Sequence, residues 1–247
     1  ARFLMLAAGN LLKPSDGRPV TIPTQDMILG SYYLTMVRDD EPGAGKVFRN
    51  FDEAKMAYDT GVVGLHAPIK VRVSREVEGK TISRLIDATV GQIIFNDPIP
   101  QDLGFVDRTD SEKQFDLEVT FLVRKKQLGQ IIDRCIRNCG TVRTSEILDR
   151  IKNQGFKYST KSGLTVAVSD ALIPENKQEL IAQADEKVAQ IKRQYDRGLI
   201  SDDVRYDRVI KVWNDTTEAV KKELNATFGE RNPIYMFADS GARGSME

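Results

Sequence analysis

The spacing of apolar side chains over residues 174–228 constrains the fold of this chain more than any other feature. Apolar residues recur there at intervals of three and four, as on a helix that packs along one face against another helix. The first run is Leu180, Ala184, Val188, Ile191 and Tyr195, and the second is Tyr206, Val209, Trp213, Thr216, Val220 and Leu224. Gly198 ends the first run, and Ser201 is a favourable N-cap for the second.

Two such helices joined by a short turn form an antiparallel coiled-coil hairpin. At a rise of ~1.5 Å per residue, each arm would be roughly 30 Å long. A pair of helices is too narrow to enclose a core of its own. We therefore expect the hairpin to protrude from a separate body.

The rest of the chain shows shorter patterns, which predict a body of helices and strands. Ile69, Val71 and Val73 alternate with charged residues, as on a half-buried strand. Further strands are expected over 89–96 and 164–168, and helices over 51–58, 125–138 and 145–153, the last ended by Gly155. Hydrophobic residues make up 40% of the chain, which is enough for a real core.

The expected fold class is therefore α+β. It combines a body of helices and a small mixed sheet with the protruding antiparallel two-helix hairpin. The expected divisions are the body over 1–170, the hairpin over 171–228, and a strand followed by a loop over 229–247.

Charge and cysteine usage exclude several classes of protein. Lys and Arg total 36 and Asp and Glu total 36, so the chain lacks a long-range field that would attract nucleic acid or an anionic membrane. The sequence has no apolar run near the ~20 residues of a membrane span. Cys135 and Cys139 could form half of a metal site, but zinc needs about four ligands and the single histidine, His66, is distant. We expect two free thiols in a reduced, cytoplasmic protein.

The segment that contains Arg243 differs from the rest of the chain, because it places one arginine among small residues. It reads Ser240-Gly241-Ala242-Arg243-Gly244-Ser245 and follows an apolar run over 234–238. Glycines let a backbone approach a ligand closely, and arginine presents a planar set of donors to phosphate oxygens. These residues alone leave two interpretations open, a phosphate contact and an ordinary flexible loop.

Several segments together resemble the β′ subunits of bacterial RNA polymerase. They lie over 1–6, 23–35, 89–96, 155–165, 205–210 and 238–245, in the order found in that family. The second begins Pro23-Thr24-Gln25-Asp26-Met27-Ile28-Leu29-Gly30, and the last is Ala238-Asp239-Ser240-Gly241-Ala242-Arg243-Gly244-Ser245. The last block, in order with the others, is highly specific.

The resemblance implies an internal piece of a large enzyme. This piece would line the secondary channel, through which nucleoside triphosphates enter and the 3′ end of backtracked RNA leaves during DNA-templated RNA synthesis. The family's aspartate-rich loop for catalytic magnesium would precede residue 1, and the bridge helix and trigger loop would follow Ser245. The chain would then hold no catalytic residue, metal or cofactor and would be inactive alone, although the whole nucleotidyltransferase uses Mg²⁺.

The resemblance also implies partners and residue roles. The partners would be the rest of β′, the β, α and ω subunits, DNA template, RNA and transcription factors that act through the secondary channel, with no membrane. Arg243 matches the family arginine that approaches the triphosphate of the incoming nucleotide, and Gln25 and Asp26 match a pore segment. The candidates for factor docking near the hairpin tip are Tyr195, Arg197, Asp202, Asp203, Arg205, Asp207 and Arg208. No alarmone site is predicted, because Ile136, Asp207 and Arg208 differ from the residues that some relatives use.

Two other interpretations compete with this one. A stand-alone coiled-coil interaction module without a catalytic role would also contain the hairpin. The abrupt ends, with no initiator Met, favour an internal piece instead. An independent enzyme is disfavoured, because the sequence offers no convincing nucleophile, base or metal set.

Overall fold

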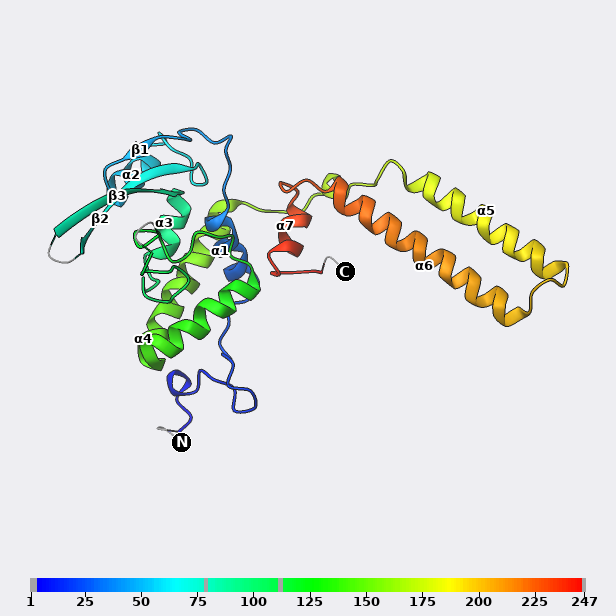
Figure 1. Cartoon of the computed structure of the whole chain (residues 1–247), viewed down its shortest axis with the longest axis horizontal. Helices are drawn as coiled ribbons and strands as arrows, with labels where there is room; N and C mark the ends of the chain where they lie inside the picture. Colours follow the sequence, from blue (N-terminus) through cyan, green and yellow to red (C-terminus); the bar gives the residue numbers. More distant parts are fainter. Residues whose placement is uncertain (1–3, 78–79, 111–112, 246–247) are drawn as a thin grey trace. The chain divides into compact units, whose positions relative to one another are not determined.

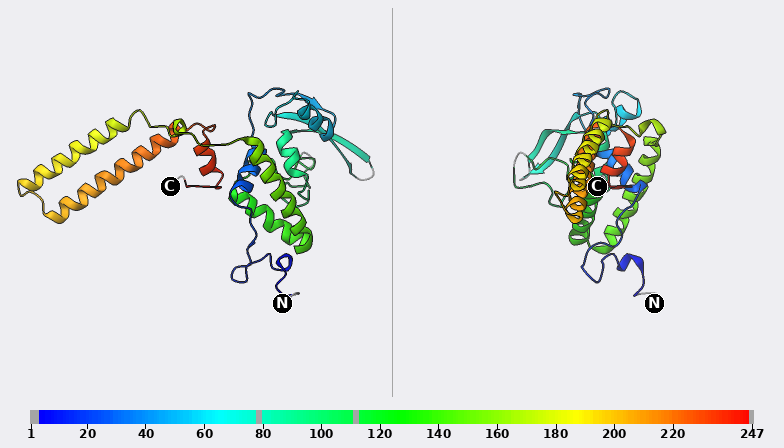
Figure 2. Two further views of the ribbon diagram at one scale, coloured as in Figure 1. Left: turned by 180° about the vertical axis from the view of Figure 1, so that it is seen from behind. Right: turned by 90° about the vertical axis from the view of Figure 1, so that its right-hand side faces the viewer.

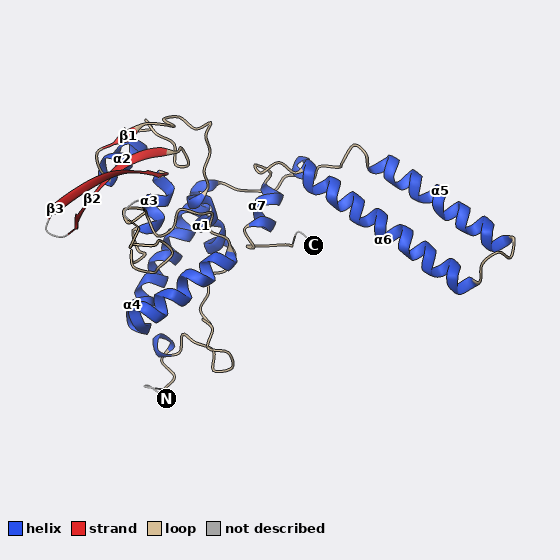
Figure 3. Cartoon of the chain, in the orientation of Figure 1, coloured by secondary structure: helices blue, strands red, loops and turns tan. Residues whose placement is uncertain are grey.

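The computed structural model describes residues 4–77, 80–110 and 113–245. The chain divides into two compact units: Ala1–Leu164 with Phe237–Ser245 form the first, and Thr165–Met236 form most of the second. The first unit contains helices and a small mixed sheet, and the second contains a long helix pair (Figures 1 and 3). The expected α+β class and the helical hairpin are both confirmed.

The sheet of the first unit has the strand order β1-β2-β3. The strands are β1 (Val47–Phe48), β2 (Ile69–Val77) and β3 (Lys80–Ala88). β1 runs parallel to β2, and β2 is antiparallel to β3 with Val71 opposite Ile86. Val71 and Ile86 are both buried. Arg72, the next residue along β2, is exposed, because successive side chains of a strand point to opposite faces of the sheet. The strand expected over 69–73 is confirmed.

Helix α2 (Phe51–Asp59) follows β1 along the chain. The side chain of Asn50 accepts a hydrogen bond of 2.8 Å from the backbone N–H of Glu53, which satisfies one of the free donors at the start of the helix. This confirms the helix expected over 51–58.

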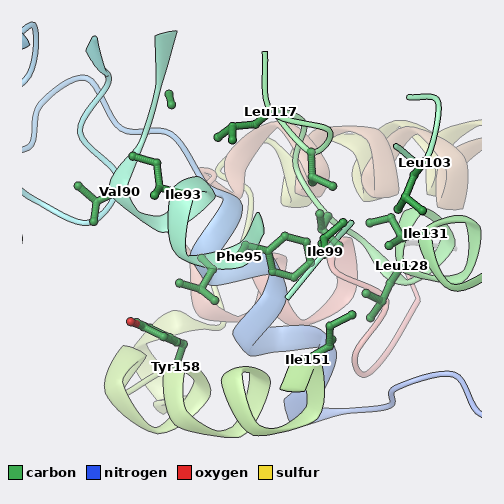
Figure 4. Close-up of a cluster of buried hydrophobic side chains, with 14 of the residues drawn as sticks. Val90, Ile93, Phe95, Ile99, Leu103, Leu117, Leu128, Ile131, Ile151 and Tyr158 are labelled. Carbon is green, nitrogen blue, oxygen red and sulfur yellow. The ribbon is translucent and has the colours of Figure 1, made fainter. Parts of the chain in front are cut away.

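The core of the first unit includes residues from α1 (Asp26–Thr35), α3 (Val90–Asn96) and α4 (Lys125–Ser162). Figure 4 shows Ile93 and Phe95 of α3 and Leu128, Ile131 and Ile151 of α4 among its buried side chains. The helices cross so closely that only glycine fits at two points. A Cβ atom on Gly30 would overlap the carbonyl oxygen of Gly155, and one on Gly91 would overlap the carbonyl oxygen of Leu34.

The strand expected over 89–96 is wrong, because this segment forms helix α3. Thr89 and Gln92 form a capping box: Gln92 N–H donates to Thr89 Oγ1 and Thr89 N–H donates to Gln92 Oε1, both at 3.1 Å. Asn96 then bonds in both directions with Val119, at 2.8 and 3.1 Å. The short apolar run did not distinguish a buried helix from a buried strand, and the polar residues within it decide for the helix.

The two helices expected over 125–138 and 145–153 are two arms of the bent helix α4. The bend lies at Gly140, whose φ of 75° and ψ of 174° are outside the helical region. Gly155 does not end the second arm, contrary to expectation. A Cβ atom there would lie 2.7 Å from the carbonyl oxygen of Met27, so this glycine serves the close contact with α1. The helix ends at Gly163, which is left-handed with φ 59°.

The strand expected over 164–168 is also wrong. Val166 and Val168 are 54% and 96% exposed, and the segment leads into the short 3₁₀ turn η2 (Val168–Asp170). A strand needs a neighbour to pair its backbone groups. In the described part of the chain, no strand of the sheet pairs with this segment.

A buried ion pair organises the irregular segment between α3 and α4. Glu118 has a fully buried side chain and lies 3.0 Å from the guanidinium of Arg108. The other carboxylate oxygen accepts from the backbone N–H of Phe105 at 2.8 Å. Arg108 also donates to the carbonyl oxygens of Gln114 and Asp116, at 2.8 and 2.7 Å. The side chains of Arg108 and Glu118 thus provide hydrogen-bond partners for several backbone groups that lie outside the helices and the sheet.

The second unit is built on α5 (Lys177–Asp196) and α6 (Asp202–Thr227), which run side by side in every view (Figure 2). Gly198 ends α5 with φ 70°, and its N–H donates to Tyr195 O (2.8 Å) while Leu199 N–H donates to Gln194 O (3.0 Å). These two bonds are a Schellman motif. Ser201 caps α6 by accepting from Val204 N–H at 3.4 Å. Both sequence signals for the turn are confirmed.

The contact face of α6 is shifted by one position at two places. Tyr206 and Trp213, which the spacing assigned to the contact face, are 59% and 38% exposed. The half-buried positions are Arg205, Val209, Val212, Thr216, Ala219, Val220, Lys221, Glu223 and Leu224, so the spacing placed Val209, Thr216, Val220 and Leu224 correctly. The arginine stem at 205 and the valine at 212 pack in the seam, and the larger aromatic rings lie beside it.

The strand expected within 229–247 is replaced by helix α7 (Pro233–Asp239). Pro233 suits the first helical position, because its missing N–H would have no helical partner there. Asn232 accepts from Ile234 N–H at 2.9 Å and so acts as the N-cap. A further short 3₁₀ turn, η1, spans Ala7–Gly9. Among the helices of the described residues, none combines the length and the apolarity that crossing a bilayer would need.

Candidate functional site

Arg243 lies in a turn that follows α7 and is fixed at its base. Ser240 is fully buried, and its hydroxyl donates to Phe237 O (3.1 Å) and accepts from Ala242 N–H (3.2 Å). Arg243 N–H donates to Phe237 O at 3.1 Å, and Gly241 takes a φ of 72° that glycine adopts without strain. The Arg243 side chain is exposed, and in the part of the chain that the structure describes its guanidinium has no partner.

Asp239 ties this turn to two helices of the first unit. Tyr32 on α1 donates its hydroxyl to the Asp239 carboxylate at 2.9 Å. Arg124, the N-cap residue of α4, donates from Nε to both carboxylate oxygens at 3.1 Å. Lys125 N–H donates to Ser240 O at 3.0 Å. The backbone before Arg243 is therefore held in place, while the guanidinium group of Arg243 is left free to contact a ligand. A backbone that is already ordered loses less conformational entropy when a ligand binds.

Gln25 and Asp26 lie at the start of α1, and both are exposed. Gln25 has φ 46° and ψ −117°, and it is the only described residue other than glycine with a positive φ. Its carbonyl oxygen accepts from Ile28 N–H (2.9 Å) and Leu29 N–H (3.0 Å), which holds the unfavourable conformation in place. Backbone strain of this kind is concentrated at functional sites. Among the hydrogen bonds and ion pairs of the described residues, none joins Gln25 or Asp26 to Arg243.

The hairpin tip brings together only some of the candidate residues there. Arg205 donates to Asp202 Oδ1 at 2.7–2.8 Å, and its guanidinium lies 5.3 Å from the centre of the Tyr195 ring. Arg208 donates to Gln194 on the opposite helix at 3.0 Å. The remaining candidates, Arg197, Asp203 and Asp207, are exposed, and within the described residues their side chains have no partner. The tip therefore presents charges of both signs beside an aromatic ring.

Sequence reasoning proposed Arg243 as a site residue, which stays a prediction, but it missed the residues that hold its turn. The bonds from Tyr32 and Arg124 to Asp239 join residues 207 and 115 positions apart, and no periodic pattern signals such contacts.

Burial keeps two titratable groups of the core, His66 and Cys135, in their neutral forms. His66 is 1% exposed and packs edge-on against Tyr33, with ring centres 4.5 Å apart. Burial, and then the charge of Arg38, lower the pKa of His66 to about 4. Burial also raises the pKa of the Cys135 thiol to about 12, and Cys135 and Cys139 are both free. Across residues 4–77, 80–110 and 113–245, no three His, Cys, Asp or Glu side chains gather in a set that fits a metal ion such as magnesium.

The sequence has counterparts in a known family. Residues 10–171 match the family model described as RNA polymerase Rpb1, domain 3. The chain therefore belongs to this family of domains from the large subunits of RNA polymerases.

The relatives are bacterial subunits whose printed name is DNA-directed RNA polymerase subunit beta′. The chain is 56% identical over 245 residues to those of Clostridium novyi and Caldanaerobacter subterraneus subsp. tengcongensis. It is 53% identical over 246 residues to that of Acetivibrio thermocellus. These matches cover 99–100% of this chain and 21% of each relative. The chain thus spans about a fifth of the length of the curated relatives it matches.

Proposed function

We propose that this chain forms part of the wall of the secondary channel in a cytoplasmic bacterial DNA-directed RNA polymerase. In that place it contributes to the passage of nucleoside triphosphates toward the active centre and of backtracked RNA 3′ ends away from it. The other subunits, the rest of β′, the DNA template and the RNA complete the enzyme. Identity of 53–56% to beta′ subunits across the whole chain supports this assignment.

Arg243 is the residue that we propose contacts the triphosphate of the incoming nucleotide. The observation that carries this proposal is the contrast between its fixed backbone and its unpaired, exposed guanidinium. A guanidinium offers several donors in one plane and can bind two phosphate oxygens at once. As the resemblance to β′ subunits implies, the proposal places the catalytic magnesium on residues outside this chain.

The test is made in the whole polymerase with purified Arg243→Ala and Arg243→Lys variants. The alanine variant is expected to raise the KM for nucleoside triphosphates about tenfold or more, because one charge-assisted contact is lost. The lysine variant keeps the charge but not the planar pair of donors, so it should fall between the alanine variant and the natural enzyme. Nucleotide addition with unchanged KM and rate in the alanine variant would refute the proposed contact.

The α5–α6 hairpin is the part that we propose binds regulatory factors. Tyr206, Ile210 and Trp213 are exposed at i, i+4 and i+7 spacing on α6, so they form an apolar stripe beside the hairpin seam. At the tip, the Arg205–Asp202 pair stacks near Tyr195, and aromatic and arginine side chains of this kind are frequent in protein interfaces. The stand-alone interaction module would use the same surface, so only the arginine test separates it from the polymerase assignment.

A further inference from the structure

The ribbon formed by β2 and β3 reaches beyond the core of the first unit. The two strands pair over nine residues each, from Ile69 opposite Ala88 to Val77 opposite Lys80. At ~3.3 Å per residue the ribbon is roughly 30 Å long. Its far end extends past α3 (Figures 1 and 3). The channel proposal gives this ribbon no role.

The outer edge of β3 is open. In the strand order β1-β2-β3 this strand is last, and among the described residues no strand pairs with its other side. β1 pairs only with Lys70 and Val71, so the far part of the ribbon consists of two strands. A two-stranded ribbon is marginally stable by itself, and a third strand would stabilise it.

The ladder identifies the backbone groups that face this open edge. Lys70 N–H donates to Lys46 O on the β1 side at 2.9 Å, so Lys70 and Asp87 are a non-hydrogen-bonded pair of the β2–β3 ladder. Such pairs recur at every second position of an antiparallel ladder. Ser83, Leu85 and Asp87 therefore turn their N–H and C=O groups toward the open edge.

This edge lacks the usual devices that prevent another strand from adding. Natural edge strands are commonly blocked by proline, by a bulge or by inward-pointing charges. β3 contains no proline, and its register with β2 is unbroken. Residues 82–85 are all exposed, including Ile82 at 43% and Leu85 at 45%. The edge is therefore a regular template for strand addition.

One face of the ribbon carries positive charge at its far part. Arg75 and Arg84 lie on the face that, nearer the body, carries the buried residues Val71 and Ile86. Arg75 is half-buried, and within the described residues its guanidinium has no hydrogen bond or ion pair. Burial, and then the charge of Arg108, lower the pKa of Arg75. A carboxylate on this face would meet an excess of guanidinium groups.

A strand that fits this edge alternates acidic and apolar residues. Successive side chains of an added strand point to opposite faces, so one set lies near Arg84 and the other near Ser83 and Leu85. Carboxylates suit the first face, and apolar side chains suit the second. A basic strand would meet like charge, because residues 72–85 include four basic and two acidic residues, namely Arg72, Arg75, Lys80 and Arg84 against Glu76 and Glu78.

We propose that the open edge of β3 is a docking site for an extended acidic and apolar segment of a partner protein. The segment adds to β3 as an antiparallel strand, with its carboxylates toward Arg75 and Arg84 and its apolar side chains toward Leu85. Main-chain hydrogen bonds then supply affinity, and the alternating side chains supply specificity. The proposal goes beyond the channel proposal and does not depend on it.

The test titrates the 247-residue chain with a synthetic peptide of alternating valine and glutamate, blocked at both ends. Saturable binding is expected below about 1 mM peptide, measured by calorimetry. In a nitrogen-labelled sample, the largest amide shifts and the slowed amide exchange should fall on Ser83, Leu85 and Asp87. The same peptide with lysine in place of glutamate should bind about tenfold more weakly or worse. Absence of saturable binding, or largest shifts outside 69–88, would overturn the site.

Ser83→Pro tests the main-chain bonds. It removes an N–H that faces the open edge and leaves the ladder with β2 intact, so it is expected to weaken binding about tenfold or more. Ser83→Ala keeps the N–H and is the matched control, with affinity within about twofold of the natural chain. Equal affinities of the two variants would overturn strand addition.

Methylated peptides repeat this test without altering the protein. In an antiparallel strand the valines lie opposite Ser83 and Leu85, so methylation of the valine N–H groups should abolish binding. Methylation of the glutamate N–H groups is the control and should have little effect. Equal effects of the two methylated peptides would contradict an added strand.

The charge requirement is tested with Arg84→Gln and its control Arg72→Gln. Both variants lose one positive charge, but Arg72 lies on the opposite face of the ribbon. At ~0.15 M salt, Arg84→Gln should weaken binding of the glutamate peptide about fivefold or more, and Arg72→Gln by less than about twofold. Equal losses would indicate non-specific attraction and would overturn the acidic partner. A dimer in sedimentation that Ser83→Pro abolishes would also overturn it, in favour of a second copy of this chain.

Discussion

Phe95, Ile131 and Ile151 in the first unit are almost fully buried, whereas Ala184 is the one buried residue in α5 and α6. The first unit is held together by long-range packing in which helices touch backbone to backbone. The hairpin depends on local devices, namely the Schellman motif at Gly198, the Ser201 cap and a thin seam. The difference teaches that substitutions in the first unit act on folding, while most substitutions in the hairpin leave the fold intact and act on what binds there.

Gly30→Ala is expected to have the largest effect on stability. Its Cβ atom would overlap the carbonyl oxygen of Gly155, and backbone atoms cannot move aside as a flexible side chain does. We expect a loss of at least about 4 kcal/mol in the free energy of unfolding of the first unit. Gly129→Ala is the matched control on α4, since its nearest neighbour would be 3.8 Å away, and it should stabilise by up to about 1 kcal/mol. Similar urea midpoints for both variants would contradict the close crossing.

Glu118→Gln should have the next largest effect. The substitution removes the charge opposite Arg108 in a pair whose acidic side chain is fully buried. Breaking a buried pair by removing one partner costs about 3 to 4 kcal/mol, because the other charge remains without compensation. Asp202→Asn breaks the exposed pair with Arg205 at the hairpin tip and should cost less than about 1 kcal/mol. Chemical denaturation measures the free energy of unfolding of both variants. Equal losses would contradict the inference that the first unit depends on buried contacts and the hairpin on exposed, local ones.

Mild acid should weaken the first unit through His66. Its pKa is about 4 in the folded chain against 6.5 for the free group, so the unfolded state binds more protons between these values. Stability is therefore expected to fall as pH drops from 6.5 toward 4, by up to about 3 kcal/mol. His66 is the only histidine in the chain, so the hairpin should show no such histidine-linked loss. The pH slope of the unfolding free energy should shrink in His66→Asn, and an unchanged slope would exclude this origin.

The smallest effect on stability is expected for Tyr206→Ser. This side chain is 59% exposed, so the free energy of unfolding should change by less than about 1 kcal/mol. In the whole polymerase the same variant should weaken binding of a secondary-channel factor about tenfold or more, because exposed aromatic residues dominate many interfaces. Co-sedimentation with the factor measures the loss. Unaltered factor binding would assign the stripe no part in docking.

The sequence was most informative where structure is local. Gly198 and Ser201 predicted the turn of the hairpin, and Asn50 predicted the start of α2, because caps are decided by a few neighbouring residues. Arg243 became a candidate for a similar reason, since its small neighbours and its charge are adjacent in the chain, and its phosphate contact stays a prediction. The strand over 69–73 followed from simple alternation.

Errors arose where distant residues decide the outcome. The segment over 89–96 was expected to be a strand, and it is a helix because Gln92 and Asn96 bond to a segment more than twenty residues away. Gly155 was expected to end a helix, and it instead admits the backbone of α1. On α6, Arg205 rather than Tyr206 lies in the seam, because a long side chain can cover an apolar surface with its stem.

The position of Trp213 has a practical consequence for anyone who follows the unfolding of this chain with light. It is the only tryptophan, and it lies on the hairpin, whereas Tyr32, Tyr33, Tyr58 and Tyr158 belong to the first unit. Indole emission consequently reports the hairpin alone. A steady tryptophan signal during heating would say nothing of whether the first unit has melted, and tyrosine absorbance is the probe to record beside it.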